Sequence, residues 1–366
     1  MRRRGLFALT VALFVFAIYD AIQLTFFLRA GFFPDFRLFW NAARLVLAHG
    51  PGAVYATQAS PWPYLNPPLL AWLVIPLAAL PFDVAYAIWI VASLAALTWA
   101  AWVAGVGWRG ALAGLALLPA FVAIGSGQVA PLILLALVWA VRLEARGRWI
   151  TAGLLFSLLA VKPQLGFLLP VALLASSRWR PVAATAAAGA VIGAATVASL
   201  GFDGVRSWAT AVSAFSHNSY FLRWSLVSLV GDSGWWLALP IVAALVGLGA
   251  RRWKADPMMV VGLGVCGSIL VNHYLTPSDL VVLLLPVWAL LRARSTMAAL
   301  GGLLWTGTWL CLWFPWATIA AESLVLVAAA LPFVAPHPLI RSLGVTGRSG
   351  CSCDPPSGRH SAPSRP

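Results

Sequence analysis

Long apolar runs, separated by short polar or charged stretches, dominate the sequence. A helix that crosses a bilayer needs about 20 apolar residues, and a shorter helix is tolerated where it faces protein or water. The pattern therefore predicts an all-α polytopic membrane protein with about 11–13 hydrophobic helices, some short or not fully spanning. The predicted segments are residues 5–27, 68–81, 84–104, 110–124, 130–141, 149–161, 164–177, 181–200, 234–250, 258–273, 279–291, 297–314 and 317–335.

The composition also indicates a polytopic membrane protein. Hydrophobic residues make up 61% of the 366 residues and charged residues only 9%, whereas soluble domains are about 45–50% apolar and 25% charged. Such a chain cannot cover itself with polar surface, which excludes a soluble enzyme, a disordered protein and a nucleic-acid module. The net charge of +14 comes from small basic groups between apolar runs, as in cytoplasmic loops. These groups are Arg2–Arg4, Arg142–Arg148, Arg178–Arg180, Arg251–Lys254 and Arg292–Arg294.

The basic groups also predict a topology in a plasma (inner) membrane. Gly5–Leu28 is interpreted as an uncleaved first span with a cytoplasmic N-terminus. Residues 28–67 and 201–233 then form outer-side loops of a single domain, residues 1–335. An odd number of crossings is needed before residue 201, so one short segment, with 68–81 the weakest, is expected not to cross. The Pro- and Ser-rich residues 336–366 are expected to form a disordered cytoplasmic tail.

The first outer loop carries an amphipathic pattern that ends at Gly50 and Pro51. Aromatic and apolar residues recur at helical spacing from Phe36 to Leu47, and Arg37 and Arg44 share another face. This favours a helix in the membrane interface with its aromatic side toward lipid. Asp35 lies just before it, where a carboxylate caps the helix or acts as a general base toward a hydroxyl, and the two roles are compatible.

Several motifs resemble those of one family of membrane enzymes when they are taken in order. They are Asp35 ahead of a juxtamembrane helix, Gly50–Tyr55, Tyr64–Leu69, Gly125–Gln128, Val161–Gln164 with Arg178–Arg180, and Asn272–Asp279 followed by Leu285–Pro286. Together they resemble glycosyltransferase family 87, the polyprenyl-phosphate-mannose-dependent mannosyltransferases of the GT-C fold. The resemblance implies an inverting transfer of a sugar, mannose in that family, from a polyprenyl-phosphate donor to a glycan or glycolipid acceptor on the outer face. It also implies that Asp35 is the catalytic base.

That chemistry needs groups that stabilise a departing phosphate, and phosphate leaves without a second acid to protonate it. The donor-phosphate candidates are Lys162, His273, Arg37 and Arg44. Each has another interpretation: a snorkelling lysine, a structural histidine, or arginines that face anionic lipid. The candidates for sugar or acceptor binding are Gln128, Tyr64, Asn66, His217 and Asp279, and Asp279 also fits a helix cap.

We expect no cofactor and no metal, because the sequence has no Cys/His metal spacing, no nucleotide fingerprint and no acid near Asp35 in its loop. The expected partners are the lipid-linked donor, the acceptor and the bilayer, without nucleic acid. Two other functions stay open at this point. One is a lipid or solute transporter or flippase, although no internal repeat supports it, and the other is a catalytically degenerate membrane scaffold.

Overall fold

Helices account for 84% of the residues that the computed structural model describes, and this part of the chain contains no strand. The described residues are 10–22, 35–56, 64–216, 219–293 and 295–331. The chain is an all-α polytopic membrane protein, as the apolar pattern predicted. The predicted tail, residues 336–366, lies outside the described residues.

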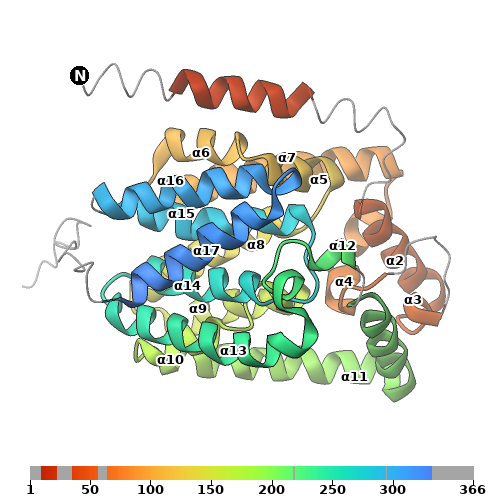
Figure 1. Cartoon of the computed structure of the whole chain (residues 1–366). Helices are drawn as coiled ribbons and strands as arrows, with labels where there is room; N and C mark the ends of the chain where they lie inside the picture. Colours follow the sequence, from red (N-terminus) through yellow and green to blue (C-terminus); the bar gives the residue numbers. More distant parts are fainter. Residues whose placement is uncertain (1–9, 23–34, 57–63, 217–218, 294, 332–366) are drawn as a thin grey trace, which may run out of the picture. The chain divides into compact units, whose positions relative to one another are not determined.

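The helices follow the predicted apolar segments in order (Figure 1). After a first helix, Thr10–Ile22, they are α2 Asp35–His49, α3 Ala53–Ala56, α4 Pro68–Ala78, α5 Phe82–Val103, α6 Gly107–Leu115, α7 Leu118–Ser126, α8 Ala130–Glu144, α9 Trp149–Phe156, η1 Ser157–Val161, η2 Pro163–Leu165, α10 Leu169–Ala175, α11 Trp179–Ser216, α12 Ser219–Leu222, α13 Val227–Arg252, α14 Pro257–Leu270, η3 Pro277–Leu283, α15 Leu284–Leu291, α16 Ser295–Trp309, η4 Leu310–Leu312 and α17 Pro315–Ala330.

Three of these helices are long and apolar enough to cross a bilayer: α5, α11 up to Ala214, and α13. The predicted segment 110–124 is instead two helices, α6 and α7, bent by 72°. The bend follows from the local sequence, because Leu117 is extended and Pro119 occupies the first turn of α7. Seven shorter apolar helices in the described part of the chain have 10–17 residues, and one of them, α4, the weakest predicted span, has 11 residues with Pro76 inside it.

Two glycines mark the ends of the predicted outer segment 201–233. Gly201 interrupts α11 with φ 66° and ψ 173°, and Gly231 interrupts α13 with φ 68° and ψ 178°. Residues with a Cβ avoid this backbone region. The sequence therefore ends the two long apolar helices at the points where the outer segment was expected to begin and end.

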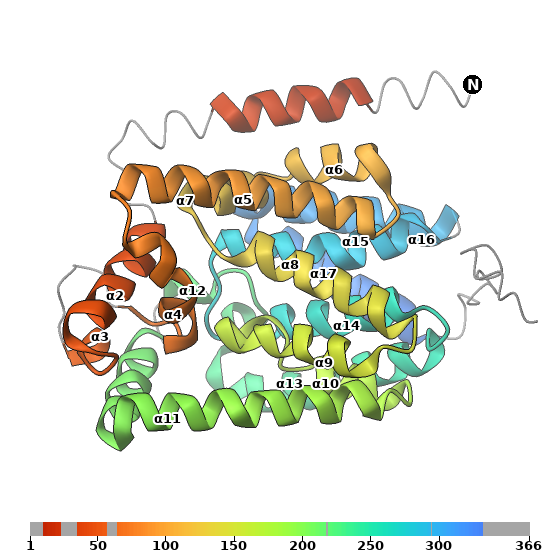
Figure 2. The ribbon, with the colours of Figure 1, turned by 180° about the vertical axis from the view of Figure 1, so that it is seen from behind.

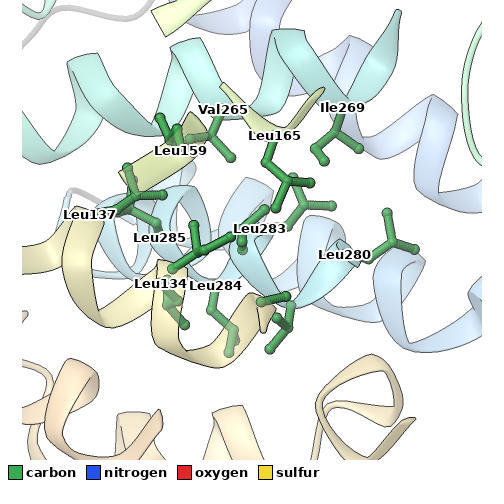
Figure 3. Packing of buried hydrophobic residues seen from close by; sticks show 14 of the residues in the cluster. Leu134, Leu137, Leu159, Leu165, Val265, Ile269, Leu280, Leu283, Leu284 and Leu285 are labelled. Atoms are coloured by element: carbon green, nitrogen blue, oxygen red, sulfur yellow. The ribbon is translucent and has the colours of Figure 1, made fainter. Parts of the chain in front are cut away.

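The apolar core packs around the short helices in the middle of the chain (Figure 3). Leu134 and Leu137 of α8 meet Leu159 and Leu165, which flank the turn between η1 and η2, and residues 280–285. Leu165 is fully buried, and so is each residue from Leu280 to Leu285. In this packing η3 contacts both α8 and α14, and η2, which follows Lys162, contacts α14.

The prediction that the aromatic face of α2 points to lipid is wrong. Phe36, Phe39 and Ala43 have exposed fractions of 0%, 1% and 0%. Phe36 packs on Trp89 of α5 with ring centroids 5.0 Å apart, and Phe39 packs edge-on against Tyr64. An amphipathic pattern looks the same whether the apolar face is buried in lipid or in protein, and here α4 and α5 bury it.

The basic loops meet at one end of the helices. Arg178, between α10 and α11, donates from Nε to Glu144 at 2.9 Å and from a terminal nitrogen to the Lys254 carbonyl at 2.7 Å. One arginine therefore joins the loops that follow α8, α10 and α13, three of the loops predicted to be cytoplasmic. Figure 2 shows α9 and α10 beside the long helix α11, which they contact.

The closest approach between α9 and α11 gives a stability test. A Cβ on Gly153 would lie 2.4 Å from the Cβ of Ala184 and 2.9 Å from the Pro181 carbonyl, whereas Gly193 of α11 has no atom within 4 Å of its Cβ position. We expect Gly153→Ala to destabilise the detergent-solubilised protein by about 1–3 kcal/mol through overpacking. Gly193→Ala should be neutral or stabilising, since alanine favours helices. Thermal unfolding checks this, and equal melting temperatures for both variants would contradict it.

Candidate active site

The position of Asp35 is set by the aromatic residues that follow it. Asp35 begins α2, and the next side chain, Phe36, is held between Trp89 and Tyr86 of α5 with centroid distances of 5.0 and 6.0 Å. This anchor directs the start of α2 toward the turn between α7 and α8. The carboxylate is partly buried there.

The turn Gly125–Gln128 is shaped to meet Asp35. Gly127 ends α7 with φ 70°, and a Cβ on it would lie 2.6 Å from the Cβ of Phe36. The Tyr86 hydroxyl donates to the Gly125 carbonyl and fixes the turn from α5. The side chain of Gln128, with 6% exposed, then donates from Nε2 to Asp35 Oδ2 at 2.8 Å. Only glycine allows both the left-handed turn and the close approach of α2.

The second part of the site is a buried ion pair. Lys162 lies in the non-helical turn between η1 and η2 and is 3% exposed. Its Nζ donates to Oδ1 of Asp279, a fully buried residue, at 2.5 Å. The other oxygen, Oδ2, accepts from the backbone nitrogen and the hydroxyl of Thr276, both at 3.1 Å, which forms a capping box at the start of η3. Asp279 is therefore both a helix-capping residue and the partner of the lysine.

The two parts interact electrostatically. Burial raises the pKa of Asp35 above its ordinary value, whereas the Gln128 amide, the Lys162 ammonium and the Ser126 hydroxyl lower that pKa and the Asp279 carboxylate raises it. Asp35, Gln128, Lys162 and Asp279 thus form one cluster, although they come from four separate parts of the sequence. Within the part of the chain that the structure describes, no three His, Cys, Asp or Glu residues are grouped to hold a metal.

The segment Asn272–Tyr274 lies beside this cluster. Asn272 donates from Nδ2 to the Gln164 carbonyl at 2.7 Å and accepts from the Tyr274 backbone nitrogen at 2.8 Å, which ties the segment to η2. The Tyr274 pKa is raised, first by burial and then by the charges of Asp279 and Asp35. His273 faces another way: its Nε2 is 3.5 Å from Asp232 Oδ1, and its ring meets Trp235 edge-on at 4.7 Å.

The two arginines of α2 lie on its exposed face. The Arg37 guanidinium lies over the Phe82 ring at 4.0 Å, and the Arg44 guanidinium lies over the Trp40 ring at 4.7 Å. Both cations are therefore held against aromatic rings. His217, a candidate for sugar or acceptor binding, lies outside the described residues.

Tyr64 and Asn66 take part in packing between α3, α4 and α11. The Tyr64 hydroxyl donates to the Pro67 carbonyl at 3.2 Å, and the Asn66 carbonyl accepts from the Tyr55 hydroxyl at 2.6 Å. Trp208, beyond the Gly201 break, donates to the Leu65 carbonyl at 2.9 Å. These contacts connect the entry into α4 with the part of α11 beyond Gly201.

The sequence analysis did not identify Tyr86, Trp89 or Ser126 as part of the site. The sequence holds only six tyrosines, and a tyrosine inside an apolar helix is a signal that could have found Tyr86. Trp89 carries no such signal in a chain with 20 tryptophans. Ser126 lies within the Gly125–Gln128 motif that had been singled out.

The fold and the site define a helical membrane protein with a cluster of two carboxylates, an amide and an ammonium. A comparison with protein families matches glycosyltransferase family 87 over residues 64–278, more than half of the chain. The chain therefore belongs to this family, which is of the GT-C type. Comparisons with curated proteins and with solved structures gave no match.

The Lys162–Asp279 pair predicts that the effects of substituting its two residues on stability are not additive. Lys162→Met leaves the Asp279 carboxylate buried without its cation, which costs about 3–5 kcal/mol. Adding Asp279→Asn removes that charge, and the amide oxygen still accepts from Thr276, so we expect the double variant to be more stable than Lys162→Met. Thermal unfolding in detergent measures this. Glu144→Gln, which breaks the partly exposed pair with Arg178, is the control and should cost about 1 kcal/mol or less. A double variant less stable than Lys162→Met would contradict the interpretation.

Proposed function

We propose that this glycosyltransferase moves a sugar from a polyprenyl-phosphate donor to a hydroxyl of a glycan or glycolipid on the outer face of the plasma membrane, with inversion and with Asp35 as general base. The sugar we propose is mannose, following the resemblance of the motifs. The observation that carries the proposal is the cluster in which a carboxylate held by Gln128 lies within electrostatic reach of the Lys162–Asp279 pair.

The transfer divides into a proton step and a displacement. The acceptor hydroxyl gives its proton to the Asp35 carboxylate as its oxygen bonds to the anomeric carbon. The bond from that carbon to the phosphate oxygen breaks on the opposite face, and the phosphate leaves with the electron pair. A carboxylate whose pKa is raised toward neutrality by burial is a better base than an exposed one.

Lys162 is proposed to act on the departing phosphate. Its ammonium carries three N–H donors, of which Asp279 takes one. The pairing keeps the lysine charged in an apolar surrounding and fixes its direction. His273, Arg37 and Arg44 are proposed to assist the phosphate or its lipid head group, and Gln128 to contact the sugar. For Tyr64 and Asn66 we propose indirect support of the acceptor side through the packing described above.

Substitution of Asp35 tests the proposed base. Asp35→Asn keeps the size and the contact with the Gln128 side chain but cannot take a proton, so we expect transfer to fall at least about a thousand-fold. The measurement supplies radiolabelled polyprenyl-phosphate mannose to membranes and follows label into lipid and glycan products. Asp203→Asn, on the exposed outer half of α11, is the matched control and should retain activity. Full activity of Asp35→Asn with normal protein levels would remove Asp35 as the base.

The pH dependence gives a separate test. Transfer requires deprotonated Asp35, so the rate should fall as the pH decreases through its pKa. Because the Gln128 amide lowers this pKa, Gln128→Leu should raise it and move the acidic limb to higher pH by about one unit or more. Initial rates over a pH series measure the shift. An unchanged limb, or one that moves to lower pH, would show that Asp35 does not control it.

A further inference from the structure

Three buried polar atoms around Gly127 have no hydrogen-bond partner among the described residues. They are Trp89 Nε1, Ser126 Oγ and Gln128 Oε1, in residues that are 7%, 2% and 6% exposed. A buried polar group without a partner costs about 1–3 kcal/mol, and native proteins keep few of them. Three such atoms at one turn beside the proposed base mark a place where a ligand can supply the partners.

The atoms lie close together because of the Gly127 turn. Ser126 and Gln128 flank Gly127 directly, and the Cβ position of Gly127 is 3.4 Å from Trp89 Cδ1, the atom bonded to the indole Nε1. The Trp89 ring itself packs on Phe36, the neighbour of Asp35. The indole, the hydroxyl and the amide oxygen thus surround one turn at the edge of the Asp35 carboxylate.

The donor and acceptor pattern defines the ligand. Gln128 directs its Nε2 to Asp35, so its Oε1 is fixed as an acceptor that faces another group. An indole nitrogen only donates, and a serine hydroxyl does both. A phosphate dianion has no proton to give to Oε1, and the Asp35 carboxylate would repel it. A sugar hydroxyl donates and accepts at once and carries no charge.

We infer that Trp89, Ser126 and Gln128 form a subsite for the hydroxyl groups of a neutral sugar, next to the Asp35 base and separate from the Lys162 ammonium. The inference rests on the proposed function and deepens it, because it assigns the sugar ring to the Gly127 turn and the phosphate to the lysine side. All three atoms are covered by protein in this structure, so binding requires a local displacement of the side chains around them.

Ser126→Ala gives the sharpest test, with Ser268→Ala as the matched control. The Ser268 hydroxyl is also buried, but it donates to the Gly264 carbonyl at 2.7 Å and accepts from the Leu168 nitrogen at 2.9 Å. Without ligand, Ser126→Ala should melt close to the unchanged protein, because the Ser126 hydroxyl makes no hydrogen bond of standard geometry and acts on Asp35 less than the Gln128 amide does. Ser268→Ala should melt at a lower temperature, because the Leu168 N–H is left unpaired.

The binding arm uses two probes, methyl α-mannoside and inorganic phosphate, with purified full-length protein in detergent. We expect the mannoside to raise the melting temperature, and Ser126→Ala and Trp89→Phe to require about ten-fold more of it, the effect of one hydrogen bond. Phosphate should give the same response in these variants as in the unchanged protein. The inferred subsite would be contradicted if Ser126→Ala lowered the melting temperature without ligand and left the rise in melting temperature with the mannoside unchanged. Loss of the phosphate response alone would also overturn it.

Transfer assays separate this inference from the proposed function. On the high-pH plateau of the rate, Ser126→Ala should raise KM for polyprenyl-phosphate mannose about ten-fold with a smaller change in kcat. Unchanged KM in an active enzyme overturns the subsite and leaves the function intact. Absence of any transfer by the unchanged protein, together with mannoside stabilisation that Ser126→Ala weakens, overturns the proposed reaction and supports the subsite.

Discussion

The buried pair of Lys162 and Asp279 is the interaction on which the site depends. An isolated ion in an apolar interior costs several kcal/mol, so each of the two charges depends on the other for its stability. The pair joins the turn between η1 and η2 to the start of η3, which lies 117 residues later in the chain. Asn272 and Gln164 add a second link between the same segments, and the leucines around Leu165 and Leu280 close the core around them.

The position of Asp35 depends on glycine and aromatic residues. Phe36 can reach its place between Trp89 and Tyr86 only because Gly127 has no side chain to occupy that space. Because Gly127 has no side chain, the chain can also form the left-handed turn that directs Gln128 to the Asp35 carboxylate. The Asp35 carboxylate, the proposed base, is thus held by contacts from α2, α5 and the turn after α7, and rigid elements of this kind keep a side chain in place better than a loop does.

The helices and several site residues could be predicted from the sequence. The length of an apolar run indicates a helix, and a lone charged residue in an apolar chain indicates a site. Asp35, Lys162 and Asp279 stand out for that reason, and Gln128 stands out as part of the Gly125–Gln128 motif. Their grouping could not be predicted, since the sequence holds no distance between residues a hundred positions apart. The burial of α2 was also hidden, because an aromatic stripe suits lipid and protein equally. Trp89 resembles any lipid-facing tryptophan of an apolar helix until the partners of its indole are known.

The charges of the cluster constrain how an anionic donor can bind. Asp35 and Asp279 carry two negative charges against the single positive charge of Lys162, so the ionised cluster has an excess of one negative charge. A phosphate that approaches Lys162 is attracted by one cation and repelled by two carboxylates, and the proposed reaction therefore needs further cations. A neutral sugar meets no such barrier beside Asp35, which favours the proposed arrangement, with the sugar at the Gly127 turn and the phosphate on the Lys162 side.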